Sequence, residues 1–150
     1  MTHAALPMPL VLDTNVVLDL LVYDDAAVRP LWSALETGRV TAWADASTLG
    51  ELKYVLAYPS FALDAQAQAA AFERYQRLVR VAEASPDAPL APLPRCRDRA
   101  DQKFLELAAR VRATWLVSKD KRVLSMAGRA GLPFGILASR HLAQVLPRDN

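Results

Sequence analysis

The chain has 150 residues, which is room for one domain and hardly for two. Apolar residues make up 53% of it and charged residues 23%, so it can bury a sizeable core, and a disordered, fibrous or low-complexity protein is excluded. The net charge of +2 is far below that of a protein that coats nucleic acid or an anionic membrane non-specifically.

The residue types that remain limit the chemistry to carboxylates. The single cysteine, Cys96, excludes an internal disulfide framework and a cysteine-based zinc site, and it is typical of a reducing compartment. The two histidines, His3 and His141, are too few for a histidine-rich metal centre. No apolar stretch approaches the roughly 20 residues of a membrane span, and the first residues lack the basic and apolar regions of a signal peptide. We therefore expect a cytoplasmic protein that does not enter a membrane.

Predicted strands and helices alternate along the chain. The first apolar run ends at Asp13, and Thr14 or Asn15 is a plausible N-cap for the helix that follows. In chain order we expect a strand at 10–12, helices at 16–21 and 26–37, a strand at 40–44, helices at 47–58, 65–84 and 98–112, a strand at 114–118, a helix at 122–129, a strand at 134–137 and a last helix that begins at Ser139. A loop that crosses over the fold interrupts this order and contains Pro86, Pro89, Pro92 and Pro94.

This order of elements predicts the fold class. Strands that alternate with helices, and that are apolar without polar alternation, indicate a parallel sheet covered on both faces. We therefore expect an α/β protein, a three-layer α/β/α sandwich around a central parallel sheet, formed by a single domain over residues 1–150.

Four acidic residues should gather at one edge of that sheet. Asp13 and Asp120 each follow a predicted strand, while Glu51 and Asp101 lie in the first turns of helices that start from the same edge. Ligand sites of open parallel sheets lie at the carboxyl ends of the strands. Carboxylates without histidine or cysteine form an all-oxygen site, which suits Mg²⁺ or Mn²⁺ and not zinc. The cluster would repel itself and would need cations to stay ionised.

Each of these acids also has a purely structural interpretation. Asp13 could cap a helix, and Thr48 with Glu51 matches the capping-box pattern. Asp101 is well placed to interact with a helix dipole, and Asp120 could be a solvated turn residue. The joint pattern favours a common site, because capping does not require all four side chains to converge on one sheet edge.

Four segments of the chain resemble the PIN domain, the nuclease fold of VapC-like toxins, and in particular the PIN family of toxin components of toxin–antitoxin pairs. The segments occur in order and are VLDTNVV at 11–17, STLGEL at 47–52, CRDRADQKFLELA at 96–108 and LVSKD at 116–120. The resemblance covers about residues 9–146. It implies a Rossmann-like fold and a ribonuclease that depends on Mg²⁺ or Mn²⁺.

The resemblance also implies roles for particular residues. The acidic quartet that binds metal would be Asp13, Glu51, Asp101 and Asp120, with Glu51 acting through a water. Supporting residues would be Thr14, Asn15, Ser118 and the additional acid Asp98, which ranks below the quartet. The chain departs from the family pattern at two places. Lys121 and Arg122 follow Asp120 where a further acid is common, and Arg-Ala precedes Asp101 in place of Pro-Asp.

The expected partners are an RNA substrate, a small antitoxin protein and a second copy of the chain in a homodimer. Helices 16–21, 26–37 and 47–58 carry more apolar residues than one core face needs, which predicts a groove for a partner helix. Basic residues beside the acids could hold RNA phosphates, and they are Arg95, Arg97, Arg99, Lys103, Lys119, Lys121 and Arg122. Arg74, Arg77 and Arg80 are expected to share one face of the long helix.

Two other functions stay open. In a metal-dependent phosphatase of similar topology Asp13 would be the nucleophile, but Asn15 stands where such a site needs a second acid. A non-catalytic PIN-fold module that binds RNA or protein is the other alternative, and the intact quartet argues against it. We expect Trp32, Trp43 and Trp115 to pack in the core in preference to stacking on bases.

Overall fold

The computed structural model describes residues 6–83, 93–96 and 98–148, which contain five strands in one fully parallel sheet. The strands are β1 (Met8–Leu12), β2 (Val40–Ala44), β3 (Val79–Val81), β4 (Trp115–Ser118) and β5 (Gly135–Ala138). They lie in the order β3-β2-β1-β4-β5. The sheet thus grows outward from β1 in one direction, and the chain then returns to place β4 on the other side of β1.

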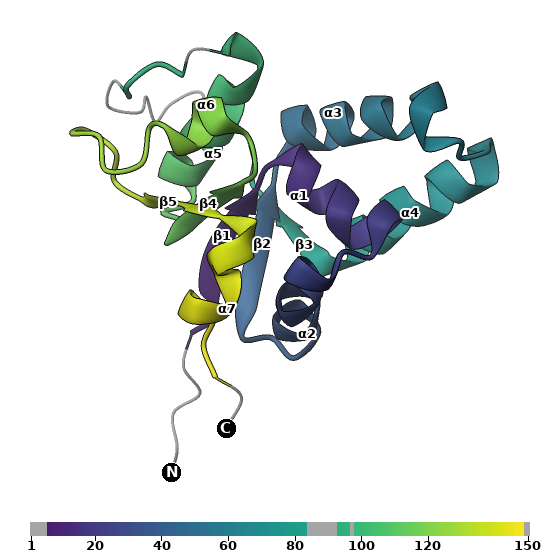
Figure 1. Ribbon diagram of the computed structural model, residues 1–150, viewed down its shortest axis with the longest axis horizontal. Coiled ribbons are helices and arrows are strands. Elements are labelled where there is room, and N and C mark those ends of the chain that lie inside the picture. Colours follow the sequence, from purple (N-terminus) through teal and green to yellow (C-terminus); the bar gives the residue numbers. More distant parts are fainter. Residues whose placement is uncertain (1–5, 84–92, 97, 149–150) are drawn as a thin grey trace.

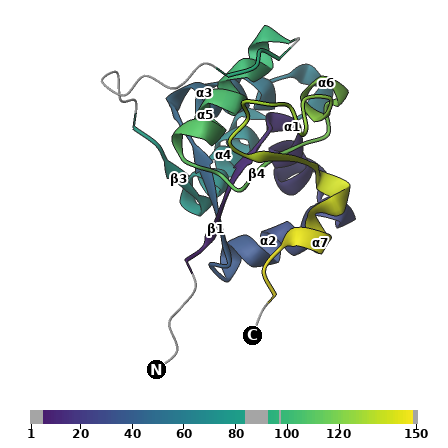
Figure 2. The same ribbon diagram turned by 90° about the vertical axis from the view of Figure 1, so that its left-hand side faces the viewer.

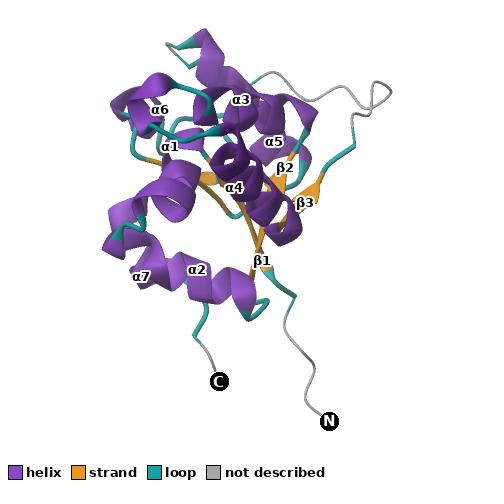
Figure 3. Ribbon diagram, turned by 90° about the vertical axis from the view of Figure 1, so that its right-hand side faces the viewer, coloured by secondary structure: helices purple, strands orange, loops and turns teal. Residues whose placement is uncertain are grey.

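Helices cover both faces of this sheet, as the three-layer prediction requires. Figure 1 shows α5 and α6 on one side and α1, α2 and α4 on the other, and Figure 3 shows α4 in front of the sheet. The α-helices are α1 (Thr14–Leu18), α2 (Arg29–Glu36), α3 (Ala46–Leu56), α4 (Ala65–Leu78), α5 (Gln102–Arg110), α6 (Lys121–Leu124) and α7 (Leu142–Val145). Shorter turns are a π-helical turn at Asp19–Tyr23 and 3₁₀ turns at Ala26–Val28, Pro59–Phe61, Arg99–Asp101 and Ser139–His141.

The core has two halves, one on each face of the sheet. Side chains alternate along a strand, so Leu10 and Leu12 of β1 pack into the half that α1, α2, α3 and α4 close. Val11 packs into the other half with Phe104 and Leu105 of α5. Both faces of β1 are therefore buried, which is the physical reason why the strand shows no polar alternation.

The predicted helix over 65–84 is wrong in its last part. The helix ends at Leu78, and Val79–Val81 forms the edge strand β3, which pairs with Ala42–Ala44 of β2. Two β-branched valines around Arg80 suit a strand, and their hydrogen-bonding partner, β2, is remote in sequence. Arg80 consequently does not share a helix face with Arg74 and Arg77, and residue 84 lies outside the described residues.

The helix that carries Glu51 is capped differently from the prediction. Asp45 is its N-cap: Asp45 Oδ1 accepts from the amide of Thr48 at 2.8 Å, and Thr48 Oγ1 accepts from the amide of Asp45 at 3.0 Å. Thr48 is therefore the third residue of the helix, and the capping-box interpretation of Glu51 is wrong. At the first helix the N-cap is Asp13, in place of Thr14 or Asn15, and its side chain makes no capping hydrogen bond.

Other differences concern element lengths. The predicted helix over 122–129 is the single turn α6, which ends at Leu124, and the predicted helix over 98–112 begins as a 3₁₀ turn and ends at Arg110. Of the proline-rich loop, Pro86, Pro89 and Pro92 lie outside the described residues. Trp32, Trp43 and Trp115 are partly buried against the two halves of the core, as predicted. Within the described chain, no helix has the length and hydrophobicity to cross a bilayer.

Candidate metal centre

The site lies where β1 and β4 end side by side. The chain leaves β1 toward β2 in one direction and reaches β4 in the other, and such a reversal opens a crevice at the carboxyl ends of the strands. Figure 2 shows α1, α3, α5 and α6 toward one end of the sheet, with α2 and α7 toward the other. The candidate residues lie on the first group of helices and on the turns that lead into them.

Asp13 and Ser118 are hydrogen-bonded to each other where β1 and β4 end. The amide of Asp13 donates to the carbonyl of Val117 at 2.9 Å, which continues the pairing of β1 with β4. Ser118 Oγ donates to Asp13 Oδ2 at 2.7 Å and accepts from the amide of Asp120 at 3.0 Å. The fully buried Ser118 thus links two acids that are 107 residues apart in sequence.

Burial makes the ionised form of Asp13 costly. Asp13 is 4% exposed, and this burial raises its pKa above the ordinary value. The hydrogen bond from Ser118 opposes the rise, whereas the negative charges of Glu51 and Asp120 add to it. A cation beside these acids would relieve both effects.

Three aspartates form a cluster that could hold a metal ion. Asp98, Asp101 and Asp120 each offer one oxygen, and these oxygens all lie within 4.8 Å of one another. Asp98 and Asp120 are oriented by the turns they begin: Asp98 accepts from the amide of Ala100, and Asp120 accepts from the amide of Arg122. The structure therefore places Asp98, which the resemblance implied as a supporting residue, beside two members of the quartet.

Asp101 is the member of this cluster that lacks a partner. Its residue is 9% exposed, and Oδ2 is buried without a hydrogen bond. Burial, together with the negative charges of Asp13, Asp98 and other site acids, raises the pKa of Asp101 to about 7. A buried oxygen that no donor satisfies is costly, and a hard divalent cation is the partner that a set of carboxylates accommodates best. The donor set therefore fits Mg²⁺ or Mn²⁺.

Glu51 stands apart from the three aspartates. Thr14 Oγ1 donates to Glu51 Oε2, and Lys103 Nζ lies 2.6 Å from Oε1. Its two oxygens are thus bound by side chains of α1 and α5, both of which contact α3. Asn15 lies at the same end of the sheet, where its Oδ1 accepts from the amide of Lys119 at 3.4 Å.

Three ion pairs at the centre were not predicted. One is the pair of Lys103 with Glu51, and in another Arg122 lies 3.2 Å from Asp98. In the third, Lys119 Nζ lies 2.7 Å from Oδ2 of Asp19, which is 3% exposed. The sequence contains one indication that Asp19 belongs to this site. Asp19 follows Asn15 by four residues, so both lie on one face of α1 and the π-helical turn that continues it. Lys103 and Lys119, which the sequence suggested as phosphate ligands, are therefore each paired with an acid. Arg97 lies outside the described residues.

Comparison with known proteins identifies the family. A model of the PIN domain matches residues 9–122. A solved structure of VapBC2 from Rickettsia felis, bound to a DNA fragment from their promoter, contains a chain with the same fold at a TM-score of 0.60. The two chains are 11% identical, and the alignment covers 87% of this chain and 98% of the other. No curated protein has a matching sequence. The match over residues 9–122 places this chain in the PIN domain family.

Proposed function

We propose that this chain is a single-domain ribonuclease that depends on Mg²⁺ or Mn²⁺ and is the toxin of a toxin–antitoxin pair. The observation that carries the proposal is the buried, unpartnered Oδ2 of Asp101 beside Asp98 and Asp120, at the crevice of a PIN-domain sheet. An oxygen of this kind needs a cation, and the surrounding donors are all carboxylates. Phosphodiester hydrolysis is the chemistry that such a site supports.

The proposed mechanism divides the work among the acids. Asp98, Asp101 and Asp120 would hold the ion, with Asp13 close enough to interact with Asp101. When bound, a divalent ion polarises the phosphate and lowers the pKa of a coordinated water. Ser118 holds the Asp13 carboxylate, and Thr14 and Lys103 hold Glu51, so that a Glu51 oxygen could orient the attacking water.

The RNA backbone needs positive charge near this acidic centre. Arg95, Arg99 and Lys121 are exposed and adjoin the segments that carry Asp98, Asp101 and Asp120. Arg122, also exposed, lies 3.2 Å from Asp98 through its guanidinium. We propose that these four side chains bind phosphates on either side of the cleaved bond.

The structure argues against the phosphatase alternative. A nucleophilic Asp13 would have to reach a substrate phosphorus, yet it is 4% exposed and its Oδ2 is engaged by Ser118. Asn15, at the position of the second acid, accepts a hydrogen bond from a backbone amide through its carbonyl oxygen. A binding module without catalysis stays the alternative that experiment must separate.

Cleavage of a labelled RNA by the purified protein tests the proposal. We expect cleavage in Mg²⁺, none in excess EDTA, and a loss of at least about 100-fold in the Asp101→Asn variant, because an amide cannot replace an anionic metal ligand. Asp64→Asn is the matched control, since Asp64 caps α4 away from the centre and asparagine caps equally well. Cleavage that persists in EDTA, or an inert wild type beside a folded control, would reject the assignment.

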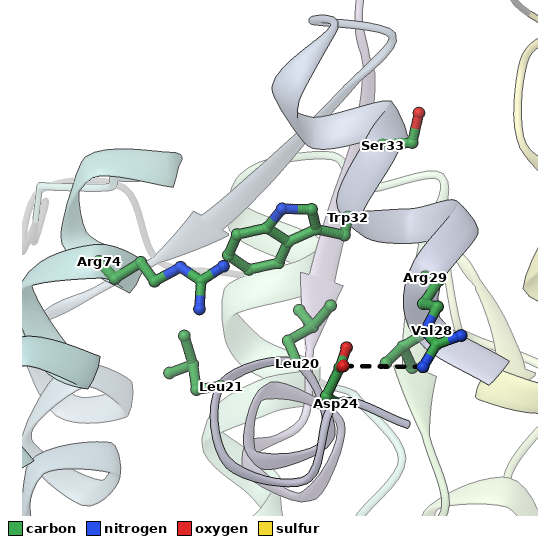
Figure 4. A pocket seen from close by; sticks show the side chains of 8 residues that line it. All are labelled: Leu20, Leu21, Asp24, Val28, Arg29, Trp32, Ser33 and Arg74. Atoms are coloured by element: carbon green, nitrogen blue, oxygen red, sulfur yellow. Dashed lines mark ion pairs between the residues drawn. The ribbon is translucent and has the colours of Figure 1, made fainter. Parts of the chain in front are cut away.

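The proposed antitoxin site is a groove of about 370 Å³ between the π-helical turn at Asp19–Tyr23, α2 and α4 (Figure 4). Leu20, Leu21 and Val28 line it, and the Arg74 guanidinium lies 4.0 Å from the centre of the Trp32 ring. The groove thus uses two of the three predicted helices, but α4 closes it in place of the Glu51 helix. That helix instead exposes Tyr54, which is 70% exposed.

Coexpression tests both protein partners. The chain alone should arrest its host, coexpression with the neighbouring reading frame should restore growth, and Leu21→Glu in the groove should abolish that rescue while RNA cleavage persists. Light scattering of the purified chain tests the homodimer, which we also propose. A chain that is harmless to its host would remove the toxin assignment and leave the nuclease assignment in place.

A further inference from the structure

Glu51 is the one acid of the quartet whose two oxygens are both bound by side chains of this chain. Thr14 donates to Oε2, and the Lys103 ammonium lies 2.6 Å from Oε1. Asp101 is the opposite case, because its buried Oδ2 has no partner. The centre therefore contains a buried oxygen that lacks a cation, at Asp101, and a carboxylate that already contacts one, at Glu51. Arg122 also contacts Asp98, at 3.2 Å, but its side chain is 62% exposed.

The pair of Lys103 with Glu51 is built into the fold. Each side chain is 24% exposed, so solvent and salt screen their attraction less than at an open surface. Lys103 is the second residue of α5 and follows Asp101 by two positions. The same short segment thus supplies a buried metal-ligand candidate and the cation that neutralises Glu51.

A second divalent ion would compete with this lysine. Sites that use two ions hold them roughly 3.5–4 Å apart, with carboxylates on both. An ion at Glu51 would have to displace the ammonium or share the carboxylate with it, and two cations in contact with one carboxylate repel each other strongly. Among the described residues, the acid cluster able to hold an ion consists of Asp98, Asp101 and Asp120 and does not include Glu51.

We infer that Lys103 takes the place of a second metal ion, so that this chain binds one divalent cation, among Asp98, Asp101 and Asp120. Lys103 is then a positioning residue: it holds Glu51 toward the centre and contributes a permanent positive charge beside the substrate phosphate. This inference rests on the metal-dependent function proposed above, and it adds the stoichiometry of the metal and the residue that sets it.

Counting bound Mn²⁺ tests the inference without measuring activity. Electron paramagnetic resonance of free Mn²⁺, during titration of the purified protein at pH 8, gives the number of ions bound per chain. We expect one ion for the wild type and for Lys103→Arg, which keeps the charge. Lys103→Met should bind a second ion at the released Glu51, and the double variant Lys103→Met with Glu51→Gln should return to one.

Lys53→Met is the matched control, because Lys53 is exposed on the same helix as Glu51 and its loss changes the net charge equally. It should bind one ion. Two ions bound by the wild type, or one ion bound by a folded Lys103→Met, would overturn the inference, and the wild-type count decides even where that variant fails to fold. One bound ion without RNA cleavage would reject the proposed function alone, whereas no bound ion would reject both.

Discussion

Replacing Asp101 by asparagine should stabilise the metal-free protein while it destroys the metal centre. Asp101 is 9% exposed, its Oδ2 has no hydrogen-bond partner, and it lies among other carboxylates. Burial and these negative charges raise its pKa to about 7 from an ordinary value of 3.8. Asparagine keeps the shape of the side chain and removes the charge that the folded state opposes.

The size of the gain follows from the pKa. A difference between 3.8 and about 7 spans about 3 pH units, and each unit corresponds to about 1.4 kcal/mol. The ionised Asp101 therefore lowers the free energy of unfolding by about 4 kcal/mol when it is ionised in both states. An amide at the same place still loses hydration, so we expect a net gain of roughly 2–3 kcal/mol, which raises the Tm by roughly 4–12 °C.

The gain must depend on pH in a defined direction. Because the pKa is higher in the folded state, the folded protein binds this proton more tightly than the unfolded chain does. The contribution of Asp101 to wild-type stability therefore improves as the pH falls from about 7 to about 4, and below that range the group is protonated in both states. The advantage of the Asp101→Asn variant should be full above pH 7 and should disappear near pH 4.

Urea unfolding in EDTA at pH 8, 6 and 4 measures this difference, with Asp64→Asn as the control for an aspartate outside the centre. Addition of Mg²⁺ at pH 8 should stabilise the wild type and leave Asp101→Asn unchanged. Asp101→Asn could instead be less stable than the wild type at pH 8 without metal. Asp101 would then make favourable interactions in the metal-free fold, and the proposal that its carboxylate requires a cation would be wrong.

Three further outcomes can be checked. Asp13→Asn should abolish RNA cleavage and leave the circular dichroism spectrum unchanged, whereas retained activity in Mg²⁺ would remove Asp13 from the centre. Glu51→Gln should impair turnover at saturating Mg²⁺ without lowering the Tm through the helix cap, because Asp45 and Thr48 form that cap; Thr48→Ala should instead cost about 1 kcal/mol in urea unfolding. The Mn²⁺ affinity, measured by calorimetry, should fall about tenfold per pH unit below pH 7, since a proton on Asp101 competes with the ion, and should level off above it; an affinity that is constant from pH 5 to 8 would contradict the role of Asp101.

The sequence was sufficient to predict which acids the parallel sheet brings to one edge. Asp13 comes directly after an apolar run, and Asp120 lies three positions after Val117, the last residue of another. The carboxyl ends of neighbouring parallel strands necessarily meet at one edge. The strand β3 was missed because it has three residues at an edge and is mostly exposed, so that its pairing with β2 determines its conformation more than its own pattern does.

The capping-box interpretation of Glu51 was wrong for a different reason. A threonine three residues before a glutamate matches the capping box, but Asp45 three residues before Thr48 can form an equivalent reciprocal pair, and the structure uses that one. The pairs of Glu51 with Lys103 and of Asp19 with Lys119 join residues 52 and 100 positions apart. No local pattern contains such contacts, since they depend on how the helices pack.

The proposed function requires that a divalent ion held by these carboxylates acts on an RNA phosphate. Cleavage of an RNA with a single sulfur in place of a non-bridging oxygen, at the bond that the protein cuts, tests it most directly. Because sulfur binds Mg²⁺ poorly and Mn²⁺ better, the account predicts that the substituted RNA is cut about tenfold or more slowly in Mg²⁺ and that Mn²⁺ restores the rate. Equal slowing in the two metals, or cleavage that continues in EDTA, would contradict it.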